Sequence, residues 1–138
     1  MLKISRLADY AVVLMHRLSV DTSKTYSANE LADRCHVPAP TVSKVLKLLS
    51  DAKLVMSIRG VQGGYHLVKD PASISIADVL LAIDGEMALT DCSLADSTCG
   101  LLEYCELRSN WRYINDQVSQ LLSKISLLDM QSSAVRER

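Results

Sequence analysis

The sequence is poor in the residues that mark disordered and fibrous chains. Its 138 residues include only three prolines and five glycines, and 49% of them are hydrophobic against 22% charged. Disordered chains are poor in apolar residues, and fibrous repeats of the collagen type are rich in glycine and proline, so this composition excludes both classes. A chain of this length corresponds to about one ordinary domain and can bury a real core.

Long apolar runs and enzyme-like motifs are absent as well. No run approaches the ~20 apolar residues that a membrane span needs, and the start, MLKISRLADYAVV, has polar breaks where a signal peptide has its apolar core. Neither a Cys-x-x-Cys redox motif nor a nucleophile and base pairing indicates an enzyme. We therefore expect a cytoplasmic protein without enzymatic activity, membrane association or a small-molecule substrate.

Charge is distributed unevenly behind a net charge of −1. Residues 1–70 hold ten Lys and Arg against six Asp and Glu, whereas residues 71–138 hold five against ten. The first half could therefore face phosphate groups, although a solvated charged face produces the same numbers.

Helical periodicity predicts a first helix over residues 4–19 and two short helices between residues 28 and 52. Ser27 followed by Glu30 is typical of a helix start, and Pro40 suits the first turn of the second short helix because its missing N–H would be unpaired there. One face of that helix is apolar, and the other carries Thr41, Ser43, Lys44 and Lys47. This pattern favours a helix-turn-helix that reads the DNA major groove, with an ordinary helical hairpin as the alternative.

A hairpin is predicted directly after these helices. Two strand-like segments, residues 54–58 and 65–68, flank a glycine-rich tip that begins at Arg59. A β-hairpin in this position is typical of the wing of a winged-helix domain, and an arginine at the tip is suited to a narrow minor groove. The element order therefore favours DNA binding. A short helix that begins near Ser75 and stops at Gly85 is expected behind the wing.

The last third of the chain has a clear heptad pattern. Its apolar positions alternate at spacings of four and three residues: Leu107, Trp111, Ile114, Val118, Leu121, Ile125 and Leu128. One helix over residues 107–129 would be ~35 Å long, which is more than internal packing of a small domain needs. We interpret it as a dimerisation helix, with packing inside its own chain as the alternative. A dimer presents two recognition helices ~34 Å apart, as a two-fold symmetric operator requires.

Three of the four cysteines lie close together, with the spacing Cys-x6-Cys-x5-Cys. Zinc sites usually contain Cys-x2-Cys pairs, so the wider spacing of Cys92, Cys99 and Cys105 better suits an iron-sulfur cluster. Three cysteines cannot complete a set of four ligands. Free structural thiols or an incidental disulfide remain alternatives, and we interpret Cys35 as a small core residue.

The helix-turn-helix, the RGVQGGYHL wing, the three-cysteine loop and the long C-terminal helix resemble the IscR/NsrR family of bacterial iron-sulfur transcriptional regulators. Within this family the chain most resembles the regulators of the SUF iron-sulfur assembly system. The resemblance covers nearly all of residues 1–130. It implies a mainly α fold with a small β-hairpin wing: a winged helix-turn-helix domain over residues 1–85, a cluster-binding loop over 86–106, a dimerisation helix over 107–130 and a flexible tail over 131–138.

The resemblance also implies roles for particular residues. It implies a cluster held by Cys92, Cys99 and Cys105, with 2Fe-2S favoured over 4Fe-4S. The recognition helix corresponds to residues 40–52. The predicted contacts with double-stranded DNA are Ser27, Pro40, Thr41, Ser43, Lys44, Lys47, Arg59, Gly60, Gly63 and Gly64. The predicted homodimer contacts are Trp111, Ile114, Val118, Leu121, Ile125 and Leu128.

The chain departs from the family pattern in two places. Some members use a histidine three residues after the last cysteine as fourth ligand, but Arg108 stands there. Other members use an aspartate from the first helix of the opposite subunit, and Asp9 resembles it, with Glu103 or Glu106 as further candidates. The wing also has Val61 and Gln62 where the family is often richer in glycine or proline, so we expect a different groove preference.

The resemblance implies a repressor that senses iron-sulfur cluster or redox status and controls iron-sulfur assembly genes. Three alternatives stay open at this point: a nitric oxide-sensing repressor, a winged-helix regulator with zinc or a thiol switch, and an iron-sulfur assembly partner that does not bind DNA.

Overall fold

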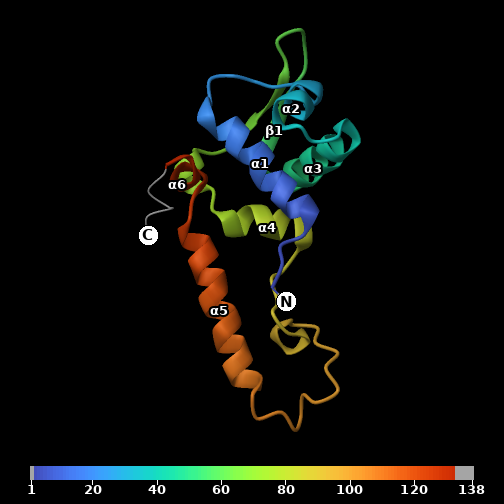
Figure 1. Cartoon of the computed structure of the whole chain (residues 1–138), viewed down its shortest axis with the longest axis vertical. Helices are drawn as coiled ribbons and strands as arrows, with labels where there is room; N and C mark the ends of the chain where they lie inside the picture. Colours follow the sequence, from blue (N-terminus) through green and yellow to red (C-terminus); the bar gives the residue numbers. More distant parts are fainter. Residues whose placement is uncertain (1, 133–138) are drawn as a thin grey trace.

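The computed structural model describes residues 2–132 as a helical body with a two-stranded hairpin and a projecting arm (Figure 1). The elements, in chain order, are α1 (Arg6–Val20), α2 (Ala28–Cys35), α3 (Ala39–Asp51), β1 (Val55–Ile58), β2 (Gly64–Leu67), the 3-10 turn η1 (Pro71–Ser73), α4 (Ile76–Asp84), the 3-10 turn η2 (Asp91–Ser93), α5 (Arg108–Lys124) and α6 (Leu127–Gln131). The mainly α fold with a hairpin after the helix-turn-helix is confirmed. Within this described part, none of the helices combines the length and apolar character needed to cross a bilayer.

Local sequence signals place the helix starts. The hydroxyl of Ser5 accepts a hydrogen bond from the Ala8 amide, and that of Ser27 accepts one from the Glu30 amide. Ser75 and Asp78 form a reciprocal capping box at the start of α4. Pro40 lies in the first turn of α3, as predicted. The serine hydroxyls satisfy free N–H groups at the helix starts, and Pro40 has no N–H that needs a partner, so the observed boundaries lie close to the predicted ones.

One hydrophobic core joins α1, α2, α3, α4 and α6. Each of these five helices contributes fully buried, mainly aliphatic side chains, and the projecting α5 contributes none. They are Leu14, Met15 and Leu18 from α1, Leu31 from α2, Val42, Val45, Leu46 and Leu49 from α3, Val79 from α4 and Leu127 from α6. The helix-turn-helix is therefore held rigidly on α1 and α4. This core fixes the direction in which the outer face of α3 points.

The C-terminal segment differs from the single helix predicted over residues 107–130. α5 ends at Lys124, and Ile125 and Ser126 are extended. The Ile76 amide donates to the Ile125 carbonyl at 2.8 Å, and the Leu127 amide donates to the Ile74 carbonyl at 2.9 Å. Because the backbone of residues 125–127 pairs with the segment before α4, it cannot continue as a helix. The prediction of one uninterrupted helix is wrong.

α6 begins where this pairing ends and is anchored at both its ends. Ser126 and Asp129 form a capping box, and Leu127 is fully buried. The side chain of Gln131 donates to the Ser19 carbonyl and to the Ser19 hydroxyl, both at 2.9 Å. Gln131 therefore belongs to the folded body and not to the flexible tail predicted over residues 131–138. Ser132 donates from its amide to the Asp129 carbonyl at 3.2 Å, and residues 133–138 of the predicted tail lie outside the described residues.

Candidate nucleic-acid interface and cysteine loop

α3 separates an apolar face from a polar face. Val42, Val45, Leu46 and Leu49 are fully buried in the core. On the other side Pro40, Ser43, Lys44 and Lys47 are exposed, and Thr41 is half-buried. Since every predicted DNA-contacting side chain of this helix faces away from the core, α3 can approach a nucleic acid without loss of packing.

The wing is an antiparallel hairpin with a tip built on glycines. β1 and β2 pair from Val55 opposite Leu67 to Ile58 opposite Gly64. The Gly63 amide donates to the Gly60 carbonyl at 3.0 Å and closes the turn. A Cβ atom at Gly63 would lie 2.1 Å from the Ile58 carbonyl oxygen, so only glycine fits there. This tight turn leaves Arg59 and Gly60 exposed at the tip.

The base of the wing is braced by the segment before α2. Tyr26 and Tyr65 exchange both backbone hydrogen bonds, at 3.1 and 2.7 Å, as an isolated antiparallel bridge. The Thr25 hydroxyl donates to the Gln62 carbonyl at 3.0 Å. A Cβ atom at Gly64 would lie 2.7 Å from the Tyr26 backbone, so glycine is required for this close approach. The wing is therefore fixed relative to the helix-turn-helix.

Charge on this face is predominantly positive and available. Within residues 2–132, Lys44, Lys47 and Arg59 make no salt bridge, and the ion pair that forms joins Lys24 to Asp21 at 3.2 Å in the turn after α1. Hydrogen bonds from Ser23, followed by Lys24, lower the pKa of Asp21 below its usual value. Cations that have no internal partner can pair with phosphate groups. Ser27, in contrast, has its hydroxyl engaged as the cap of α2.

The three cysteines of residues 86–106 are brought into one loop but not to one point. Cys92 lies in η2 with 7% of its surface exposed, and its Sγ is 3.1 Å from the Thr90 hydroxyl oxygen. Cys99 and Cys105 are half-buried further along, and all three are free thiols. Across the described part of the chain, no three His, Cys, Asp or Glu side chains are arranged to hold a metal ion. Asp9 is exposed in the first turn of α1.

The donor atoms suit a thiophilic metal centre, whereas their arrangement requires a rearrangement of the loop. All hydrogen bonds of residues 95–106 in the described structure stay within that segment, such as the Cys105 amide to the Leu101 carbonyl at 2.8 Å. A segment without hydrogen bonds to the body can change conformation at low energetic cost. The ligand set of Cys92, Cys99, Cys105 and Asp9 thus stays a prediction.

Two contacts that sequence reasoning missed hold the start of this loop. Asn115, in α5, is buried and hydrogen-bonded to the backbone of Met87 and Leu89. Arg112, one turn earlier, donates from Nε to the Cys92 carbonyl at 3.3 Å. Nothing in the sequence marks these residues, because their partners are backbone groups 20 to 28 positions away.

α5 projects from the body and carries an exposed apolar face (Figure 1). Trp111 is 39%, Ile114 42% and Leu121 60% exposed, and Val118 between them is half-buried. The last two positions of the predicted seam lie beyond the helix end. Ile125 packs against the core of its own chain, and Leu128 is exposed on α6. A contiguous exposed apolar surface of this kind marks an interaction site.

Comparisons with known proteins agree with the geometry. Residues 4–133 match the Rrf2 family, described as iron-dependent transcriptional regulators. The chain is 33% identical to a helix-turn-helix-type transcriptional regulator of Mycobacterium tuberculosis, over 99% of this chain and 85% of the relative. It is 26% identical to IscR of Vibrio vulnificus, over 95% of this chain and 78% of that relative.

Two solved structures extend the similarity to three dimensions. T. potens IscR superposes with a TM-score of 0.76 at 26% identity, and the match covers 96% of this chain and 88% of the IscR chain. CymR, the global cysteine regulator of B. subtilis, superposes with a TM-score of 0.75 at 26% identity, and the match covers 94% of this chain and 96% of the CymR chain.

Proposed function

The chain belongs to the Rrf2 family of transcriptional regulators, and from that membership we propose a homodimeric repressor whose cysteine loop senses iron-sulfur cluster or redox status in the cytoplasm. It is a DNA-binding regulator and not an enzyme. The observation that carries the DNA-binding role is the exposed polar face of α3 beside a braced wing with Arg59 at its tip. We further propose that its targets are iron-sulfur assembly genes.

The homodimer is supported by the exposed apolar face of α5. Trp111, Ile114, Val118 and Leu121 are separated by three, four and three residues and so form one stripe. Two such stripes can pack against each other around a two-fold axis, which would place two copies of α3 on one face of a DNA duplex. The domain division at residues 85 and 106 follows the same logic, with the sensing loop between the reading body and this arm.

A Leu121→Glu variant is expected to shift the dimer toward monomer. The change removes apolar burial of about 1.5 to 3 kcal/mol per subunit and places two carboxylates in the interface, so the dissociation constant should rise at least roughly 100-fold. Light scattering coupled to size exclusion over a concentration series measures this. Gln120→Glu, one residue away and exposed, is the matched control. A Leu121→Glu protein that stays fully dimeric would exclude α5 as the dimer contact.

The metal-binding role is supported by the donor chemistry of the loop. An iron-sulfur cluster, when bound, supplies a cofactor that oxygen and nitric oxide can destroy, and thiolates are its usual ligands. We propose that Cys92, Cys99 and Cys105 hold it, with Asp9 of the partner subunit as the fourth ligand. Two contacts support the place of Cys92: its Sγ lies within hydrogen-bonding distance of the Thr90 hydroxyl, and its carbonyl accepts from Arg112 of α5. The segment that carries Cys99 and Cys105 makes its hydrogen bonds within itself, so under this proposal it closes onto Cys92.

Anaerobically purified protein is expected to be brown, with visible charge-transfer absorbance that disappears in Cys92→Ala. Cys35→Ala is the matched control and should keep the absorbance, because Cys35 packs against the helix-turn-helix core. Quantification of iron, sulfide and zinc in the same samples separates the possible centres. Colourless protein with stoichiometric zinc would contradict the cluster.

A thiol switch without metal is the second candidate, because Cys92, Cys99 and Cys105 are free thiols in one loop. Under this alternative, metal analysis finds neither iron nor zinc, and the DNA affinity of metal-free protein changes on treatment with a thiol oxidant and returns with a reductant.

A further inference from the structure

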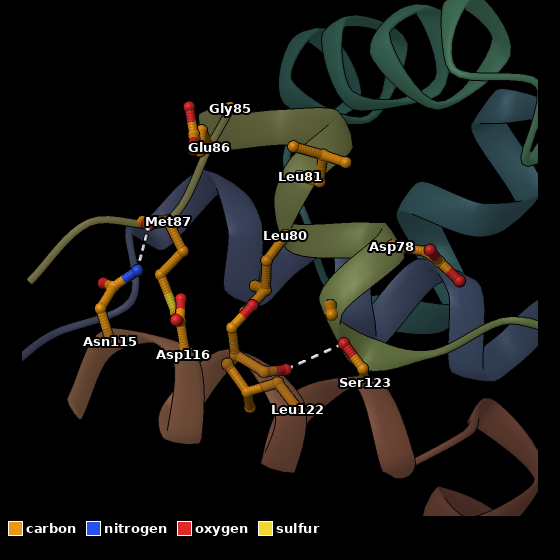
Figure 2. A pocket seen from close by; sticks show the side chains of 12 residues that line it. Asp78, Leu80, Leu81, Gly85, Glu86, Met87, Asn115, Asp116, Leu122 and Ser123 are labelled. Carbon is orange, nitrogen blue, oxygen red and sulfur yellow. Dashed lines mark hydrogen bonds between the residues drawn. The ribbon is translucent and has the colours of Figure 1, made fainter. Parts of the chain in front are cut away.

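Asn115 is a buried polar side chain whose hydrogen bonds are all directed at the start of the cysteine loop. Only 8% of its surface is exposed. Its Oδ1 accepts from the Leu89 amide at 2.9 Å, and its Nδ2 donates to the Met87 carbonyl at 3.2 Å, the bond drawn in Figure 2. One amide side chain therefore pairs with both the donor and the acceptor of a short backbone segment. The donor at Leu89 fixes which way the Asn115 amide is turned.

Arg112 adds a third attachment on the same face of α5. It precedes Asn115 by three residues, a spacing that places the two side chains on one side of the helix. Its Nε donates to the Cys92 carbonyl at 3.3 Å. The loop is therefore tied to α5 at Met87, Leu89 and Cys92, while the rest of it, up to position 106, makes no hydrogen bond to the helix in the part of the chain that the structure describes.

These attachments are a large part of what holds α5 to its own body. α5 packs mainly against α4 and η2, and η2 contains Cys92. Between α4 and α5 lies a cavity of about 290 Å³, bordered by Leu80 and Leu122 on the apolar side and by Glu86 and Asp116 (Figure 2). Because this junction is not filled, α5 has space to change its angle when the contacts around Cys92 change.

We propose that Asn115 is a positioning residue that seats Cys92 and transmits the chemical state of its thiol to α5. The inference rests on the proposed function in one respect, that the loop is the sensing element and α5 the dimer contact. With the Asn115 attachment in place, displacement of Cys92 pulls on residues 87–89 and Arg112, and so tilts the helix. Without it, Arg112 is the remaining hydrogen bond between Cys92 and α5 in the described structure, and the coupling between the thiol and the helix weakens.

The first test measures how well Cys92 is seated in the full-length, reduced and metal-free protein. Alkylation by iodoacetamide is followed for each cysteine by mass spectrometry. In Asn115→Leu, the Cys92 alkylation rate is expected to rise roughly tenfold, since the part-buried amide of Leu89 and carbonyl of Met87 lose their partner. Cys35, Cys99 and Cys105 should keep their rates. Asn115→Asp keeps the acceptor for the Leu89 amide and should give an intermediate rate, and Gln120→Leu, exposed on the same helix, should change none.

The second test asks whether the thiol state reaches α5, with Trp111 as the reporter because it is the single tryptophan of the chain. In a background with Cys35, Cys99 and Cys105 replaced by serine, methylthiolation of Cys92 should shift the emission maximum of Trp111. The shift should shrink in Asn115→Leu and in Arg112→Met, each of which leaves one attachment in place, and vanish when the two changes are combined. Thermal unfolding checks that each variant is folded.

Each outcome decides the inference. A uniform rise in all cysteine rates means that Asn115 only stabilises the fold, and this overturns the proposal. A Trp111 shift of undiminished size in Asn115→Leu, or one that is absent when Asn115 is present, also overturns it. Neither measurement involves iron or DNA, so failure here leaves the proposed regulator standing, and failure of that regulator to bind cluster leaves these results valid.

Discussion

Replacing both Lys44 and Arg59 by alanine is expected to lower affinity for operator DNA at least roughly 100-fold while the dimer stays folded. Both side chains are exposed and make no salt bridge within the described residues, so their removal leaves the core unchanged. An arginine that enters a groove contributes about 1 to 3 kcal/mol, and a dimer carries two of them. Each lysine on α3 is expected to add a phosphate contact.

Fluorescence anisotropy with a duplex from the protein's own promoter, repeated at several salt concentrations, measures the effect. A dimer of the double variant lacks four cations, so the slope of log affinity against log salt should become shallower by about 3 to 4. Lys124→Ala, at the end of α5, removes a lysine remote from α3 and should change little. Unchanged DNA affinity in the double variant would contradict the model in which α3 and the wing contact DNA.

Leu127→Ala is expected to be the most destabilising single change in the C-terminal region. Leu127 is fully buried although it lies only one residue after the extended pair at Ile125 and Ser126. Loss of a buried leucine side chain together with the cavity it leaves lowers the free energy of unfolding by about 2 to 5 kcal/mol. For a chain of this size the melting temperature should fall on the order of 10 °C.

Urea unfolding at fixed protein concentration measures this loss, because the stability of a dimer depends on concentration. Met130→Ala, on the same short helix but 40% exposed, is the matched control and should lower the free energy of unfolding by less than about 1 kcal/mol. Equal effects of the two changes would mean that α6 does not dock on the core as described.

The DNA-reading half of the fold follows from local signals. Caps at Ser27 and Ser75, Pro40 in a first turn and the glycines of the wing each act within a few residues, and the observed helices and strands begin within about two positions of the predictions. The break at Ile125 was missed for a different reason. The heptad pattern continues across it, while Ser126 and Asp129 already carry the spacing of a capping box. Ile125 is apolar because it packs on its own core, not because it faces a partner.

The conformation of the cysteine loop is much less predictable from sequence. Cysteine spacing indicates a shared centre, but residues 86–107 lack periodicity, so their conformation in the absence of a ligand cannot be derived from the pattern. The attachment by Asn115 depends on backbone groups 26 and 28 residues away, and one asparagine within a helix does not reveal such partners. Long-range contacts of this kind are visible only when the chain is folded.

The isolated backbone bridge between Ser75 and Ser126 places the segment that enters α4 beside the segment that follows α5. The segment closed by this pairing contains α4, the cysteine loop and α5, and α4 contributes the fully buried Val79 to the core. The loop and α5 are therefore fixed to the body at both ends, through α4 and through the backbone pairing at Ile125. Any displacement of α5 is then expected to load α4 and the core that carries α3.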